Sequence, residues 1–231
     1  DIANVMRGGC NHGFNHEPGF WHAHWHGRRP HRRDRHADAN GKNLGVFLVL
    51  LVMVDKRKAA RIAQPFDPRH GFDAAKGRYT AIMDADDIAH PRRLEEQLQA
   101  MDSGEADVCG SFHITLDTKS GRRRSRRSAF SDSDIRALLT IYCPLCNPST
   151  SVATELLRQH RYDPSYPHAE DYGLWCDIAS QGGRFKNITS PLLTYRLHPG
   201  QISIVRRETA NNSFKAIQAK YVQAVTGNSL V

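Results

Sequence analysis

The sequence predicts an α/β fold with a mainly parallel sheet, and three observations support this. Short apolar runs of strand length alternate with amphipathic helical patterns along the second half of the chain. The 231 residues are 39% apolar, which is enough for one domain with a sizeable core. Acidic residues directly follow one apolar run, where open α/β sheets place their ligand sites.

Composition divides the chain into three parts. Histidines and arginines crowd the first forty residues without helical or strand periodicity, which predicts a disordered or irregular segment over 1–43. Residues 44–205 are expected to form the α/β domain, and 206–231 a carboxyl-terminal amphipathic helix. The apolar run Leu44–Val54 predicts a buried strand or short core helix. It is too short to span a bilayer, which takes about twenty residues.

The net charge and the number of cysteines indicate which partners and which cellular compartment to expect. An odd count of five cysteines argues against a disulfide framework, so we expect a reducing, cytoplasmic location. The formal charge of +8 suits phosphorylated substrates or the anionic cytoplasmic face of a membrane. Lys119–Arg127 is predicted to be an exposed hairpin tip, either simply solvated or in contact with phosphates or a membrane. No aromatic-interleaved basic platform accompanies it, so no nucleic acid is expected.

The first predicted elements surround a group of acids. Tyr79–Met83 is an apolar run that predicts a buried strand, and it ends in Asp84-Ala-Asp-Asp87. Pro91 suits a first helical position, and the residues that follow it are apolar at i, i+4 and i+7, which predicts a helix through Met101. Asp107–Phe112 predicts a second strand.

Helix-capping residues, apolar stripes and glycines predict the remaining helices and strands. Ser131 with Asp134 resembles a capping box that opens a short helix through Leu139. The other predicted elements are helices over Ser151–His160 and Tyr172–Ala179, strands over Arg184–Ile188 and Leu192–Leu197, and a helix with an apolar stripe over Phe214–Val225.

Two acidic groups are candidates for chemistry. Asp84, Asp86 and Asp87 would repel one another unless a hard cation neutralised them, which favours Mg²⁺ or Mn²⁺, although a lone DxD also occurs by chance on surfaces. Glu170 and Asp171 open a predicted helix. They are either charges favoured by the helix dipole or a rigidly placed general base, and the two interpretations are compatible.

Four segments in order resemble family 2 glycosyltransferases of the inverting, GT-A type. Gly71–Asp87 resembles the family's A-K-G-x-Y helix end, strand and D-A-D-D. Asn147–Thr150 is similar to its polar turn, Ala169–Trp175 to its E-D-Y-x-L-W signature, and Tyr195–Ser203 to its Y-R-x-H-P-G-x-x-S ending. The resemblance covers about 69–203. It implies a GT-A-like sheet flanked by helices and a nucleotide-sugar donor.

The resemblance also implies roles for single residues. Asp86, Asp84 and His198 would bind Mg²⁺ or Mn²⁺, while Asp84, Asp87 and Arg69 would contact the donor. Asp171 would be the catalytic base, with Glu170 beside it. The implied acceptor is a hydroxyl of a polysaccharide, a lipid-linked glycan or a protein.

The chain departs from the family pattern at its amino-terminal side. The usual strands that end in P-T-Y-N and D-D-G-S, which hold the base and ribose, are not recognisable, although Leu44–Val54 supplies one candidate strand. The alternative to an active enzyme is therefore a truncated, non-catalytic remnant that binds an anionic partner.

Overall fold

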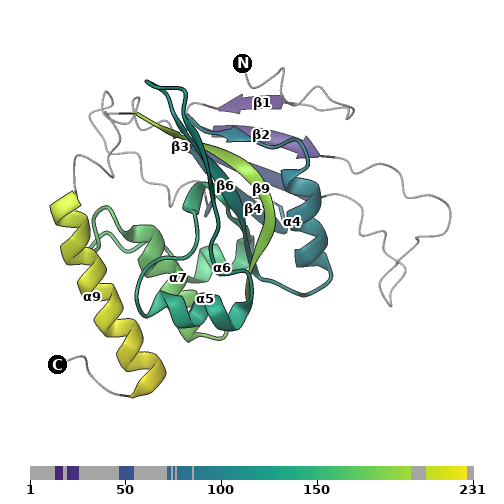
Figure 1. The fold of residues 1–231 in the computed structure, drawn as a ribbon. Coiled ribbons are helices and arrows are strands. Elements are labelled where there is room, and N and C mark those ends of the chain that lie inside the picture. Colours follow the sequence, from purple (N-terminus) through teal and green to yellow (C-terminus); the bar gives the residue numbers. More distant parts are fainter. Residues whose placement is uncertain are drawn as a thin grey trace, which may run out of the picture.

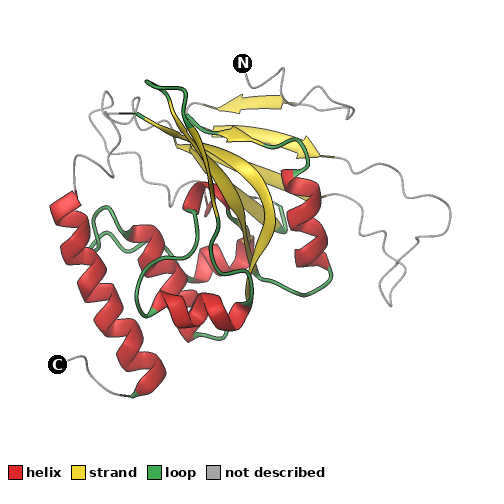
Figure 2. Ribbon diagram, viewed as in Figure 1, coloured by secondary structure: helices red, strands yellow, loops and turns green. Residues whose placement is uncertain are grey.

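A computed structural model describes residues 14–17, 20–25, 47–54, 72–73, 75, 77–84, 86–198 and 207–227. These residues form one twisted sheet with helices on both faces (Figures 1 and 2). The strands are β1 (Phe14–Glu17), β2 (Phe20–Trp25), β3 (Phe47–Val54), β4 (Tyr79–Asp84), β5 (Ile88–Ala89), β6 (Val108–Asp117), β7 (Arg123–Arg126), β8 (Ser151–Ala153) and β9 (Phe185–Leu197). The helices are α4 (Arg93–Asp102), α5 (Asp132–Leu139), η1 (Asn147–Ser149), α6 (Thr154–Gln159), α7 (Glu170–Ser180) and α9 (Arg207–Thr226).

The strand order is β1-β2-β3-β4-β8-β6-β9-β5, with β7 paired to β6. The strands β3, β4, β6 and β9 point the same way, and β3 pairs in parallel with β4 as β6 does with β9. The strand β8 runs antiparallel between β4 and β6, and β2, β5 and β7 are antiparallel to their neighbours. The predicted α/β class is confirmed, and the sheet is mixed where the sequence predicted mainly parallel pairing.

The main local difference from the predicted elements lies at β8. The first three residues of the predicted helix Ser151–His160 form this strand, and α6 begins only at Thr154. A three-residue strand leaves no apolar run to detect, because its pairing is decided by the neighbouring strands. The two strands predicted over Arg184–Leu197 are one long strand, β9, whose register with β6 shifts at Phe112.

The core lies on both faces of the sheet, because alternate residues of β4 are buried on opposite sides. Tyr79, Ala81 and Met83 pack in a cluster with α4, whereas Ile82 joins the cluster formed by α5, α7 and α9. All six residues of β4 are buried. The acids that follow this strand therefore extend from a rigid element.

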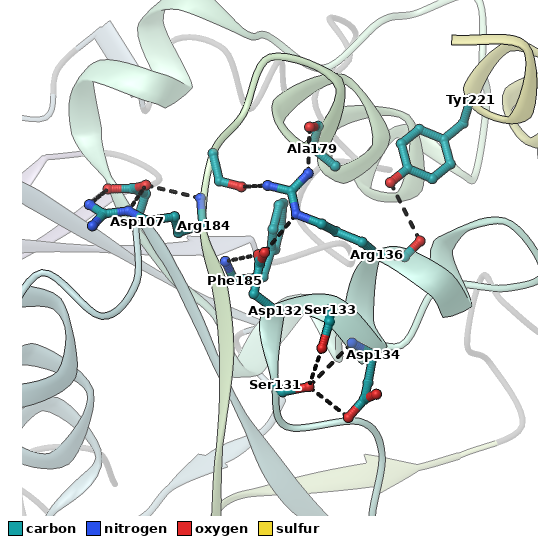
Figure 3. A network of polar contacts seen from close by, with 11 residues as sticks. Asp107, Ser131, Asp132, Ser133, Asp134, Arg136, Ala179, Arg184, Phe185 and Tyr221 are labelled. Atoms are coloured by element: carbon teal, nitrogen blue, oxygen red, sulfur yellow. Dashed lines mark hydrogen bonds and ion pairs between the residues drawn. The ribbon is translucent and has the colours of Figure 1, made fainter. Parts of the chain in front are cut away.

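An arginine network joins α5 to α7 and β9 (Figure 3). The Arg136 guanidinium donates to Asp132 at 2.7 Å, to the Ala179 carbonyl at 2.7 Å, and to the Gly183 carbonyl. Asp132 also accepts from the Phe185 amide at 2.8 Å. The predicted cap is confirmed, because Ser131 Oγ accepts the Asp134 amide at 3.2 Å.

The structure describes only some of the residues in the predicted segments 1–43, 44–205 and 206–231. Within 1–43, predicted to be irregular, the structure describes β1 and β2 as an antiparallel pair that continues to β3. In the carboxyl-terminal segment, α9 packs against α7, with Phe214 stacked on Tyr172 at 4.2 Å between ring centroids. The division into three segments stays a prediction.

Candidate active site

The first acidic group lies at the carboxyl end of β4, as predicted. Asp84 is the last residue of this strand, and Asp87 turns back so that its amide donates to the Asp84 carbonyl at 3.2 Å. Both carboxylates are largely buried, with relative exposures of 7% for Asp84 and 5% for Asp87. Asp86 between them is more exposed.

Asp86 meets His198, the residue that follows β9. The Asp86 Oδ2 and His198 Nε2 atoms lie 2.9 Å apart. Neighbouring ligands in an octahedral Mg²⁺ or Mn²⁺ site, each about 2.1 Å from the metal, are about 3 Å apart. The contact in this structure is a hydrogen bond or ion pair, and its length equals that spacing. Among the described residues no three His, Cys, Asp or Glu side chains gather around one point, so further ligands would have to come from elsewhere, as when substrate phosphates complete a Mg²⁺ site.

Arg196 holds the acidic loop in place and was not singled out in the sequence. Its backbone amide donates to Asp87 Oδ1 at 2.9 Å, and its Nε donates to the Asp86 carbonyl. It precedes His198 by two residues at the end of β9, and alternate strand residues share a face. That spacing within the Tyr195–Ser203 motif was the signal that could have identified it.

The second acidic group opens α7, also as predicted. Glu170 and Asp171 are its first two residues, and Glu170 accepts the His168 amide at 3.0 Å. His168 has φ of 67°, a left-handed conformation that is uncommon for a residue other than glycine. Such strained residues persist where the surrounding structure fixes the backbone, and here the turn sets the start of the helix.

Both acidic groups act electrostatically on buried titratable side chains near them. Burial raises the pKa of Tyr162, and the charges of Asp171 and Asp84 raise it further. Burial also raises the pKa of the Cys146 thiol, with Asp87 and Asp84 adding to the rise. The charges of Asp84 and Asp171 therefore both act on Tyr162. The Tyr162 hydroxyl donates to Asn147 Oδ1 at 3.4 Å.

A buried network of hydrogen bonds connects α4 to the strands and the turn near Asp84. Arg93, with 1% exposure, donates to the carbonyls of Ile82 at 2.8 Å and Thr150 at 3.0 Å. Gln97 donates to the carbonyls of Cys109 at 2.6 Å and Ser149 at 2.8 Å. These contacts tie α4 to β4, to β6 and to the turn before β8, and thus set where Asp84 lies relative to that turn.

The structure places the predicted site residues at the ends of three elements. Asp84, Asp86 and Asp87 lie at the end of β4, His198 follows β9 and contacts Asp86, and Glu170 and Asp171 open α7. Arg69 lies outside the described residues. Cys143 and Cys146 are free thiols. Burial raises the pKa of both, which keeps them protonated and unreactive.

The motifs and this geometry agree with a comparison against known families. Residues 69–163 match the model described as "Glycosyl transferase family 2", so this part of the chain is similar to that family. The helices on both faces of the α/β sheet agree with the GT-A-like architecture expected for this family. Within the described residues, no helix combines the length and apolar character needed to cross a membrane.

The chain is also similar to individual known proteins. The chain is 28% identical over 163 residues to an uncharacterized glycosyltransferase of Haemophilus influenzae, covering 66% of this chain and 50% of the relative. It is 29% identical over 154 residues to the amylovoran biosynthesis glycosyltransferase AmsE of Erwinia amylovora, covering 64% and 55%. The chain thus spans about half the length of the curated relatives it matches. A solved structure of S. aureus TarS in complex with UDP-GlcNAc aligns with a TM-score of 0.47 at 14% identity, covering 70% of this chain and 52% of TarS.

Proposed function

We propose that this chain carries the catalytic half of an inverting, metal-assisted transferase that moves a sugar from a nucleotide diphosphate to a hydroxyl acceptor. The observation that supports this most is the acidic group at the carboxyl end of β4, where Asp86 contacts His198 at 2.9 Å. The family match and the polysaccharide-biosynthesis relative support a glycan acceptor, whether free, lipid-linked or on a protein.

The donor would lie at the end of β4. Asp86 and His198 would hold Mg²⁺ or Mn²⁺, which when bound neutralises charge on the departing diphosphate. Asp84 is held in the neighbouring position for the ribose or the metal, while Asp87 and Arg196 keep the loop in place. The strand β3 ends level with β4, because Val54 pairs with Asp84. The carboxyl ends of two parallel strands thus meet at the donor edge.

The acceptor would enter beside α7. Asp171 accepts the proton of the acceptor hydroxyl as its oxygen attacks the anomeric carbon. The bond to the diphosphate oxygen breaks in the same displacement, and a single displacement inverts the anomeric configuration. Glu170 holds the strained turn at His168 and so positions the start of the helix that carries the base.

The base assignment is tested by Asp171→Asn, with Asp177→Asn as the same change on the same helix. We expect Asp171→Asn to lower transfer at least about a hundredfold, the range for loss of a general base, while nucleotide binding is unchanged. Asp177 is exposed and bonds to His160 at 2.6 Å, away from the acids, so its variant should keep transfer. Equal loss of transfer and nucleotide binding in Asp171→Asn would contradict the assignment.

A further inference from the structure

The hairpin formed by β6 and β7 carries a dense group of exposed cations. Between Thr118 and Ala129 the sequence contains six basic residues and no acidic ones. All six are exposed, and none forms an ion pair with another described residue. They are Lys119, Arg122, Arg123, Arg124, Arg126 and Arg127. Like charges held this close are unfavourable without counter-charges, and near the turn of the hairpin the only acid is Asp117, at the end of β6.

An apolar pocket adjoins the cationic hairpin. It has a volume of about 230 Å³, and Arg123 forms part of its wall while donating to Thr194 at 3.5 Å. Its other lining residues include Ile88, Pro91, Ile114 and Leu193, and the Ile88 side chain is 42% exposed. A pocket this small and apolar does not suit a nucleotide sugar. Apolar surface beside arginines is what interfacial membrane-binding elements present.

Both features lie next to the acidic loop. The Thr118 amide and hydroxyl donate to the Leu197 carbonyl at 3.0 and 2.9 Å, and Leu197 immediately precedes His198. Ile88 immediately follows Asp87 and pairs with Thr194 in β9. A partner bound to the hairpin would therefore be held beside the donor edge of the site.

We propose that the β6–β7 hairpin, with the exposed rim at Ile88, is a docking surface for an anionic lipid bilayer. The charge complementarity is direct, because six exposed cations form no ion pair with another described residue and each basic residue near an anionic membrane strengthens binding about fivefold. The adjoining apolar rim adds affinity for the interfacial region of the bilayer. Docking here would present the site to acceptors carried in the membrane. That consequence rests on the proposed transfer function, whereas the lipid binding does not.

The test is co-sedimentation of the purified chain with vesicles of phosphatidylcholine and phosphatidylglycerol, against vesicles of phosphatidylcholine alone. Arg124→Gln with Arg126→Gln removes two charges from one face of β7. Lys215→Gln with Lys220→Gln removes two exposed charges from α9 as a matched control. We expect the hairpin variant to bind anionic vesicles about 30-fold more weakly and the α9 variant to bind as the parent chain does. Ile88→Ser should weaken binding by a smaller factor.

Several outcomes would overturn the proposal. These are equal binding by the two double variants, binding independent of phosphatidylglycerol, or hairpin-dependent binding to DNA or RNA in place of vesicles. Nucleotide titration of the same samples separates this result from the proposed function. Loss of vesicle binding with intact nucleotide binding bears on the hairpin alone, and failure to bind nucleotide leaves the vesicle result standing.

Discussion

Replacing Gln97 with leucine should strongly destabilise the fold, because this one side chain makes four buried hydrogen bonds. It donates to the carbonyls of Cys109 and Ser149, and it accepts from Arg93 Nε at 3.1 Å and Ser151 Oγ at 2.9 Å. Leucine has a similar volume, so the effect comes from the polar groups left behind. At about 0.5–1.5 kcal/mol for each bond, we expect a loss of about 2–6 kcal/mol in the free energy of unfolding.

The assay is urea denaturation followed by circular dichroism, with Gln99→Leu as the control. Gln99 lies on the same helix but is exposed, so its substitution should change stability by less than about 0.5 kcal/mol. Ser151→Ala removes one of the four bonds and should cost about 1 kcal/mol. The reasoning would be refuted if Gln97→Leu were no less stable than Gln99→Leu.

Two further predictions concern stability. Burial, together with the charge of Arg126, lowers the pKa of His113 below its ordinary value of 6.5. At pH values between the lowered pKa and 6.5, the unfolded chain therefore binds more protons than the folded chain. The contribution of His113 to stability is complete above this pH range and falls as the pH drops through it. His113→Gln should flatten the pH dependence of urea denaturation below pH 6.5, and an unchanged slope would contradict this. Arg136→Met should cost about 2–4 kcal/mol in the same assay, because it leaves Asp132 and the Ala179 carbonyl without their charged donor, and a loss below about 1 kcal/mol would show that water replaces these bonds.

The sequence predicted those parts of the fold whose signals are local. The strand β4 and its acids were predicted because an apolar run that ends abruptly in aspartates is visible within ten residues. The predicted helix at Tyr172–Ala179 was correct because its apolar residues repeat on one face, and the structure extends it to Glu170–Ser180. The cap at Ser131 was likewise found from residues three positions apart.

The sequence could not predict features that depend on distant contacts. The direction of β8 is set by β4 and β6, and its three residues carry no pattern of their own. Arg93 and Gln97 are four residues apart, so in the sequence they resemble a solvated helix face, and only packing against β4 and β6 buries them. The distance between Asp86 and His198 links residues 112 positions apart.

The motifs located acidic residues and a histidine that the structure places at the ends of β4 and β9, but they did not identify the residue that supports them. Asp84, Asp86, Asp87 and His198 are brought to one edge of the sheet. Their roles in binding a donor and a metal stay predictions. The supporting residue Arg196 was missed because its contacts are with the backbone and carboxylates of a loop far away in sequence.

The most direct test of the central claim is calorimetric titration of the purified chain with UDP, GDP and dTDP, first with Mn²⁺ and then with a chelator. We expect one nucleotide to bind only with the metal, and both Asp86→Ala and His198→Ala to abolish that binding. Asp102→Ala, an exposed acid at the end of α4, is the control and should bind as the parent chain does. If a folded sample binds no nucleotide, or if binding persists without metal and in Asp86→Ala, the proposed donor site is wrong.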